Sequence, residues 1–168
     1  MKKENLTGSE DRFTDLKPSE LNDQEKLSIV TLATKVLAFK FRAGRALCSP
    51  DETRAYLRLK LAGYRNEVFG SLFLDNRHRI IAMRELFQGT IDGASVHPRV
   101  VVQQALEVNA AAMVCFHNHP SGVAEPSRAD ELLTRRLSDA LALVDVRVLD
   151  HFVVSGGESV SFSERGLI

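Results

Sequence analysis

Apolar residues between Asp23 and Phe41 recur at roughly helical spacing, and Gly44 closes the segment. The residues that carry this pattern are Leu27, Val30, Leu32, Ala33, Val36, Leu37 and Phe41. They predict an amphipathic N-terminal helix within residues 23–48, which could dock on the main domain or form an oligomer. Residues 1–22 show no apolar periodicity and can bury too little surface to offset the entropy of ordering, so we expect a disordered tail.

A different set of signals begins at Ser49. This serine suits a helix N-cap because a proline and two acidic residues follow it, and Gly63 ends the predicted helix. Residues 68–74 and 79–87 are rich in apolar and β-branched side chains and flank a polar turn, which predicts an antiparallel hairpin. Pro98 then opens a third predicted helix.

The C-terminal part of the chain continues the alternation of helices and strands. Residues 110–116 form a continuous apolar run that is too short for a typical helix, so we predict a strand buried on both faces. Apolar residues spaced through 133–144 predict a helix, and the segments 147–155 and 159–162 predict two strands. Helices that alternate with strands over residues 49–168 indicate an α/β layered domain.

Composition narrows the class of protein. The chain has 168 residues, 44% of them hydrophobic, which suffices for one sizeable core but not for two comfortable domains. Lys and Arg number 22, as do Asp and Glu, so composition gives nucleic-acid binding no support. Cys48 and Cys115 lie far apart among apolar residues, which suits reduced thiols. Because there is neither a signal-peptide core nor a membrane-spanning run, we expect a cytoplasmic protein without a membrane partner.

The candidate chemistry lies where the predicted strand 110–116 leaves the core. His117 and His119 stand two residues apart there, so their side chains can point to the same side and hold one cation. A catalytic zinc site has three protein ligands of nitrogen or carboxylate type and one open position, and Asp130 would supply the third ligand. Ser127 and Asp130 also have the spacing of a helix N-cap and its third residue, which taken alone is the commoner origin of such a pair. The two interpretations are compatible, because a cap can hold Asp130 in place.

The spacing His117-x-His119, seven residues, Ser127, two residues, Asp130 resembles the JAMM metalloprotease motif of JAB/MPN domains at every defined position. The full string from His117 to Asp130 resembles the RadC branch in particular. Further matches to that branch are Leu86-Phe87-x-Gly89-Thr90, Val96-His97-Pro98-Arg99, Leu149-Asp150-His151 and Gly166-Leu167. The resemblance covers roughly residues 49–168.

This resemblance implies a mixed β-sheet flanked by helices, in the JAB/MPN (cytidine-deaminase-like) architecture. It implies a zinc-dependent metallopeptidase or isopeptidase, whose Zn²⁺ is held by His117, His119 and Asp130 and whose substrate is a peptide or protein. Glu67 matches the family's general base, which acts on the water that zinc activates. Ser127 matches the donor to the oxyanion. Without the family match, we would interpret Glu67 as a solvated residue at the start of a strand.

Two other functions compete with hydrolysis. The first is a non-catalytic interaction module of a DNA-repair or mobile-element complex, with nucleic acid as a partner through family association alone. Such a module would need neither Glu67 nor Ser127. The second is a zinc nucleobase deaminase, which requires His-x-Glu and a later Pro-Cys-x-x-Cys, and this sequence has no such cysteine pair.

The remaining histidines have structural interpretations. We expect His78 to be solvated in the hairpin turn, His97 to lie in a surface turn beside the cleft, and His151 to pack within its strand. Cys115 shares the alternation face of the first motif histidine and is expected to be a small core residue. RadC relatives commonly carry Glu where this chain has Val100, a position at the start of a helix outside the metal motif.

Overall fold

The computed structural model describes residues 13, 15–47, 49–90 and 93–168. The chain divides into two compact units, residues 1–33 and 34–168. Most of the predicted tail and Cys48 lie outside the described residues, and the described part of the tail includes the 3-10 helix η1 (Pro18–Glu20). The predicted boundaries between tail, helix and domain therefore remain predictions. None of the helices in the described stretches combines the length and apolarity that crossing a bilayer requires.

The N-terminal helix α1 runs over Asp23–Lys40, where the apolar spacing predicts it. Two reciprocal hydrogen bonds cap its start: the Glu25 amide donates to Asn22 Oδ1 at 2.9 Å, and the Asn22 amide donates to Glu25 Oε2 at 2.8 Å. Just after the helix, within the second unit, Phe41 belongs to a buried cluster and its ring stacks on Tyr56 with centroids 4.3 Å apart.

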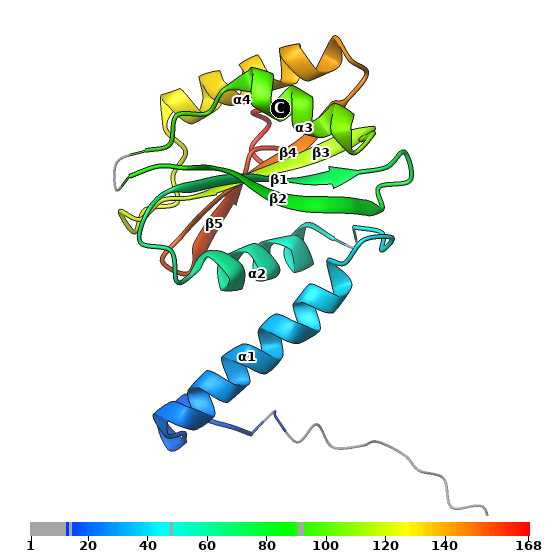
Figure 1. Cartoon of the computed structure of the whole chain (residues 1–168). Helices are drawn as coiled ribbons and strands as arrows, with labels where there is room; N and C mark the ends of the chain where they lie inside the picture. Colours follow the sequence, from blue (N-terminus) through cyan, green and yellow to red (C-terminus); the bar gives the residue numbers. More distant parts are fainter. Residues whose placement is uncertain (1–12, 14, 48, 91–92) are drawn as a thin grey trace, which may run out of the picture. The chain divides into compact units, whose positions relative to one another are not determined.

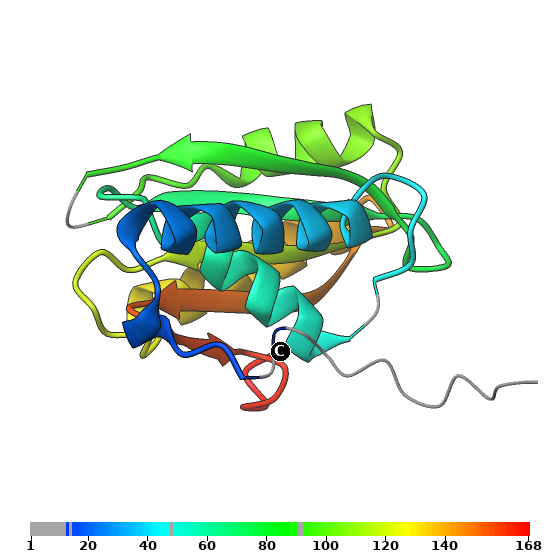
Figure 2. The same cartoon turned by 90° about the horizontal axis from the view of Figure 1, so that it is seen from below.

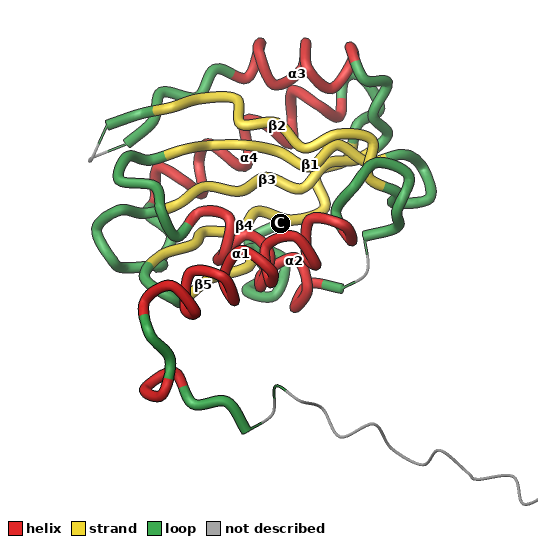
Figure 3. The backbone as a smooth tube through the Cα atoms, turned by 60° about the horizontal axis from the view of Figure 1, so that its bottom comes forward, coloured by secondary structure: helices red, strands yellow, loops and turns green. Residues whose placement is uncertain are grey.

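A five-stranded mixed sheet forms the centre of the second unit (Figures 1 and 3). Its strands are β1 (Val68–Leu74), β2 (Ile80–Gln88), β3 (Ala112–Asn118), β4 (Arg147–Ser155) and β5 (Glu158–Ser161). Their order in the sheet is β2-β1-β3-β4-β5; β3 and β4 are parallel, and the other neighbouring pairs are antiparallel. The predicted α/β class and the predicted hairpin of β1 and β2 are confirmed.

Helices cover both faces of this sheet. Helix α2 (Pro50–Leu61) lies on one face, and α3 (Pro98–Glu107) and α4 (Arg128–Ala142) lie on the other (Figure 1; Figure 2 views the α2 side). Alternate residues of a strand point to opposite faces, so Phe116 joins the buried cluster with α2 and Cys115 joins the cluster with α3 and α4. Because both faces are covered, every residue of β1 and β3 is buried, which explains the continuous apolar runs in the sequence.

The predicted end of the buried strand was wrong by two residues. Apolar character stops at Phe116, but β3 continues through His117 and Asn118 because these residues still pair with β4, opposite Val153 and Val154. Backbone hydrogen bonding does not depend on side-chain polarity, so a ladder can extend past the apolar run. The first motif histidine therefore lies inside the sheet, with its side chain 1% exposed.

Gly70 leaves room for the Phe116 ring and for the β2 backbone at Arg84, and we expect Gly70→Ala to destabilise the fold. An added Cβ would lie 2.6 Å from the Arg84 carbonyl oxygen and would clash with the Phe116 ring. Overpacking of this kind costs about 1–3 kcal/mol. The free energy of unfolding, measured by chemical denaturation, should fall by about this amount. Gly63→Ala is the control, since nothing lies within 4 Å of its added Cβ; equal denaturation midpoints for the two variants would contradict the prediction.

Candidate metal centre

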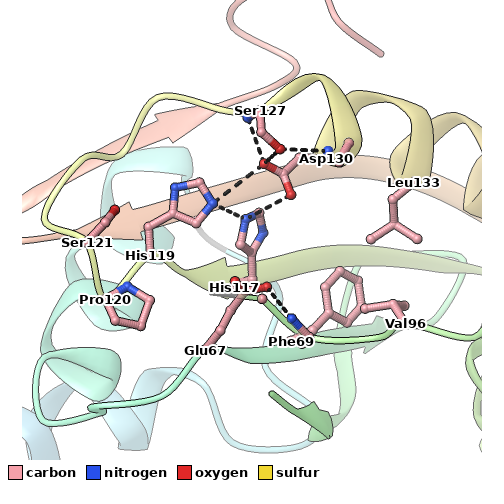
Figure 4. Close-up of a pocket in the computed structure, with 13 residues that line it drawn as sticks. Glu67, Phe69, Val96, His117, His119, Pro120, Ser121, Ser127, Asp130 and Leu133 are labelled. Carbon is pink, nitrogen blue, oxygen red and sulfur yellow. Dashed lines mark hydrogen bonds and ion pairs between the residues drawn. The ribbon is translucent and has the colours of Figure 1, made fainter. Parts of the chain in front are cut away.

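Three side chains with metal-binding atoms meet at the end of β3 (Figure 4). His117 Nε2 lies 2.9 Å from His119 Nε2. The two Asp130 oxygens approach from α4, with Oδ1 3.4 Å from His117 Nε2 and Oδ2 3.5 Å from His119 Nε2. A tetrahedral zinc ion with bonds of about 2.0–2.2 Å separates its ligand atoms by about 3.3–3.6 Å. The structure thus brings the three predicted ligands together at spacings close to those that one metal ion requires.

Hydrogen bonds on the outer sides of the two rings engage both Nδ1 atoms and leave both Nε2 atoms facing this centre. His119 Nδ1 lies 2.9 Å from the Val123 carbonyl oxygen, which can only accept, so Nδ1 carries the proton and Nε2 carries the lone pair. His117 Nδ1 lies 2.8 Å from His151 Nε2. The two Nε2 atoms are 2.9 Å apart beside a carboxylate, and if both carry lone pairs, these repel one another unless a cation lies between them or one ring takes up a proton. The donor set therefore fits a divalent metal ion.

The charges around the centre fit the same conclusion. Burial lowers the pKa of His117 to about 4 and lowers the pKa of His151 well below its usual value, so both rings are neutral near pH 7. A hydrogen bond with Asp130 raises the pKa of His119. Burial would raise the pKa of Asp130, but hydrogen bonds from the protonated ring of His119 and from Ser127 outweigh this effect and lower the pKa below its usual range. The carboxylate is thus charged and ready to balance a cation.

We expect the affinity for a divalent metal to fall as the pH falls. The proton on His119 competes with the metal for Nε2: above its pKa the ring is a neutral ligand, and below its pKa the ring is a cation. Because Asp130 raises this pKa, the loss of affinity should begin above the ordinary value of 6.5. Competition with a chromophoric chelator between about pH 8 and about pH 5.5 measures the dissociation constant. A constant value over that range would contradict the prediction.

Ser127 and Asp130 form the cap that their spacing predicts. The Asp130 amide donates to Ser127 Oγ at 3.1 Å, and the Ser127 amide donates to Asp130 Oδ2 at 2.7 Å, which is a complete capping box at the start of α4. The Ser127 hydroxyl also donates to Asp130 Oδ2, at 2.6 Å. These bonds use Oδ2 and leave Oδ1 directed at His117. Cap and candidate ligand are therefore the same carboxylate, oriented by the helix start.

Asn118, between the two histidines, positions the segment that carries Glu67. Its Oδ1 accepts from the Val68 amide at 2.8 Å and its Nδ2 donates to the Asn66 carbonyl at 3.1 Å, so it holds both neighbours of Glu67. Glu67 Oε1 accepts from the Ala94 amide at 3.1 Å, and burial raises the pKa of this carboxyl. A raised pKa brings a carboxylate closer to the range in which a general base works best. The sequence interpretation missed Asn118, although a polar residue that continues a buried run was a signal.

A cavity of about 470 Å³ opens onto the centre (Figure 4). It brings together all five predicted site residues, namely Glu67, His117, His119, Ser127 and Asp130. Phe69, Val96 and Leu133 supply an apolar part of its wall. The other predicted positions lie elsewhere: exposed His97 precedes α3, and buried Cys115 has its pKa raised to about 12 by burial, as expected of a core thiol.

Comparison with known proteins identifies related chains. Residues 47–167 match the family described as RadC-like JAB domain. A UPF0758 protein from Thioalkalivibrio sulfidiphilus is 62% identical over 141 residues, which cover 84% of this chain and 63% of the relative. A UPF0758 protein from Marinobacter nauticus is 61% identical over 137 residues, covering 82% and 61%, and one from Vibrio cholerae is 57% identical over 134 residues, covering 80% and 84%. The chain thus spans about three fifths of the length of the first two relatives.

Proposed function

This chain belongs to the RadC-like JAB domain family, and on that premise we propose that it is a zinc-dependent hydrolase of the JAMM type that cuts a peptide or isopeptide bond. The observation that carries the proposal is the cavity beside the candidate ligands. A structural zinc site is closed by four protein ligands, whereas among the described residues three candidate ligands face open space. A carboxyl with a raised pKa and a hydroxyl, Glu67 and Ser127, share that space.

The residues around the cavity divide the work of hydrolysis. His117, His119 and Asp130 would hold zinc, which would act as a Lewis acid and lower the pKa of a bound water molecule to about 7. Glu67 Oε1 accepts a hydrogen bond from the Ala94 amide, so Oε2 is the atom that takes a proton from water and later donates it to the leaving amine. The Ser127 hydroxyl turns from Asp130 Oδ2 to the oxyanion, and the loss of one such donor costs about 100-fold in rate or more.

The proposed activity predicts that the protein cleaves peptide bonds in a mixture of unfolded proteins, and that this cleavage depends on zinc. The zinc-loaded protein is incubated with such a mixture in ¹⁸O-enriched water, and new chain ends are identified by mass spectrometry. Each hydrolysed peptide bond should leave one ¹⁸O atom in the new carboxylate. Protein stripped of metal by a chelator is the control, and added zinc should restore cleavage. If the zinc-loaded protein produces no new chain ends, the result favours the hypothesis of a non-catalytic interaction module.

A further inference from the structure

Three buried polar side chains form a continuous hydrogen-bonded path from α4 through β4 to β3. Thr134 Oγ1 lies 2.7 Å from His151 Nδ1, and His151 Nε2 lies 2.8 Å from His117 Nδ1. The exposed fractions of Thr134, His151 and His117 are 1%, 0% and 1%. Buried polar groups are costly unless they are paired, and here each one bonds to the next. We propose that Thr134 and His151 are positioning residues that present His117 Nε2 to the metal.

The direction of the hydrogen bonds follows from counting protons. The Thr134 hydroxyl has one proton, which it donates to the Asp130 carbonyl oxygen at 2.7 Å. Its oxygen then accepts from His151 Nδ1–H, and a neutral ring with its proton on Nδ1 has an accepting Nε2. His151 Nε2 accepts from His117 Nδ1–H, so His117 Nε2 keeps its lone pair. The opposite direction would place a proton on His117 Nε2, where the metal must bind.

We call the direction that leaves the lone pair on His117 Nε2 the metal-binding direction. Thr134 allows it because the hydroxyl proton bonds to the Asp130 carbonyl oxygen, so the hydroxyl oxygen can accept from His151. Asp130 and Thr134 are four residues apart on α4, one turn of the helix, which places the hydroxyl beneath the Asp130 carbonyl. One threonine is thereby bonded to the residue that supplies the carboxylate ligand and, through His151, to the first histidine ligand. The ring of His151 stacks on Phe162, with ring centroids 4.8 Å apart, and makes a T-shaped contact with Phe69, with centroids 5.6 Å apart, so its orientation is fixed from two sides.

The neutral isostere Thr134→Val tests this relay against a merely structural role. Valine fills the same space but leaves His151 Nδ1–H without an acceptor, so the metal-binding direction loses support. We expect the zinc dissociation constant to rise about 10–100-fold, the range typical of lost outer-shell partners. Thr134→Ser keeps the hydroxyl and should stay within about 3-fold of the wild type. The unfolding of both metal-free variants shows whether the fold is retained.

Nitrogen-15 NMR of the histidine rings provides a second readout, since it separates the two neutral tautomers. In the zinc-loaded wild type, His117 and His151 should both carry the proton on Nδ1. Equal zinc affinity of Thr134→Val and wild type, or a proton on His151 Nε2 in the loaded protein, would overturn the relay. The inference rests on the proposed metal ligands and not on hydrolysis. A wild-type protein that binds no zinc would overturn the metal assignment itself, which is a different outcome from equal affinities.

Discussion

Zinc bound to the purified protein is expected to fall from about one ion per chain to near zero in His119→Ala and in Asp130→Ala. Each substitution removes one of three ligand groups whose atoms lie within 4.8 Å of one another. Asp130→Ala also removes the negatively charged member of these three groups, so the cation loses its charge compensation. Elemental analysis of dialysed protein measures the ratio of zinc to chain.

Two further variants separate metal binding from folding. Asp130→Ala also removes one half of the capping box, the bond in which the Ser127 amide donates to Asp130 Oδ2, which costs about 1 kcal/mol. Asp130→Asn keeps an oxygen that can accept from the Ser127 amide, so it should retain more stability than alanine while it still lowers the zinc content. His78→Ala changes an exposed histidine of the hairpin turn and should keep its zinc. Near-stoichiometric zinc in both His119→Ala and Asp130→Ala would refute the ligand assignment.

Glu67→Gln is expected to keep zinc and to lose at least about 100-fold in the rate of peptide cleavage. Glutamine has nearly the same shape, and its Oε1 can still accept from the Ala94 amide, so the segment should stay in place. It cannot accept a proton from water, and this removes the general base. The rate at which ¹⁸O-labelled chain ends form measures the effect, with metal content determined on the same sample.

Glu158→Gln is the matched control for this experiment. It makes the same chemical change at the start of β5, and Glu158 does not line the cavity. Its cleavage rate should equal that of the wild type. If Glu67→Gln also cleaves at the wild-type rate, the assignment of Glu67 as the general base is refuted. If neither the variants nor the wild type cleaves while zinc stays bound, the result favours the non-catalytic interaction module over the hydrolase.

The partners that several residues of the candidate site bind over long distances in the sequence had not been predicted. His151 was expected only to pack within its strand, and it does lie buried in β4, but it also bonds to His117, 34 residues earlier. Asn118 holds the backbone on both sides of Glu67, about 50 residues away along the chain. Such pairs arise from strand order and register, which the spacing of apolar residues does not encode. For Glu67, only the family resemblance pointed to the site.

The sequence by itself determined the local structure and the candidate ligands of this protein. Apolar periodicity and caps placed the helices and strands to within a few residues, because these depend on neighbours along the chain. The motif of His117, His119 and Asp130 indicated the family, which the match over residues 47–167 confirms; their role as zinc ligands stays a prediction. Only the tertiary structure decided where β3 ends and which groups form hydrogen bonds to the candidate ligands on the side away from the metal centre. Those features depend on β3 pairing with β4 and on α4 packing over the sheet, and both join residues far apart in sequence.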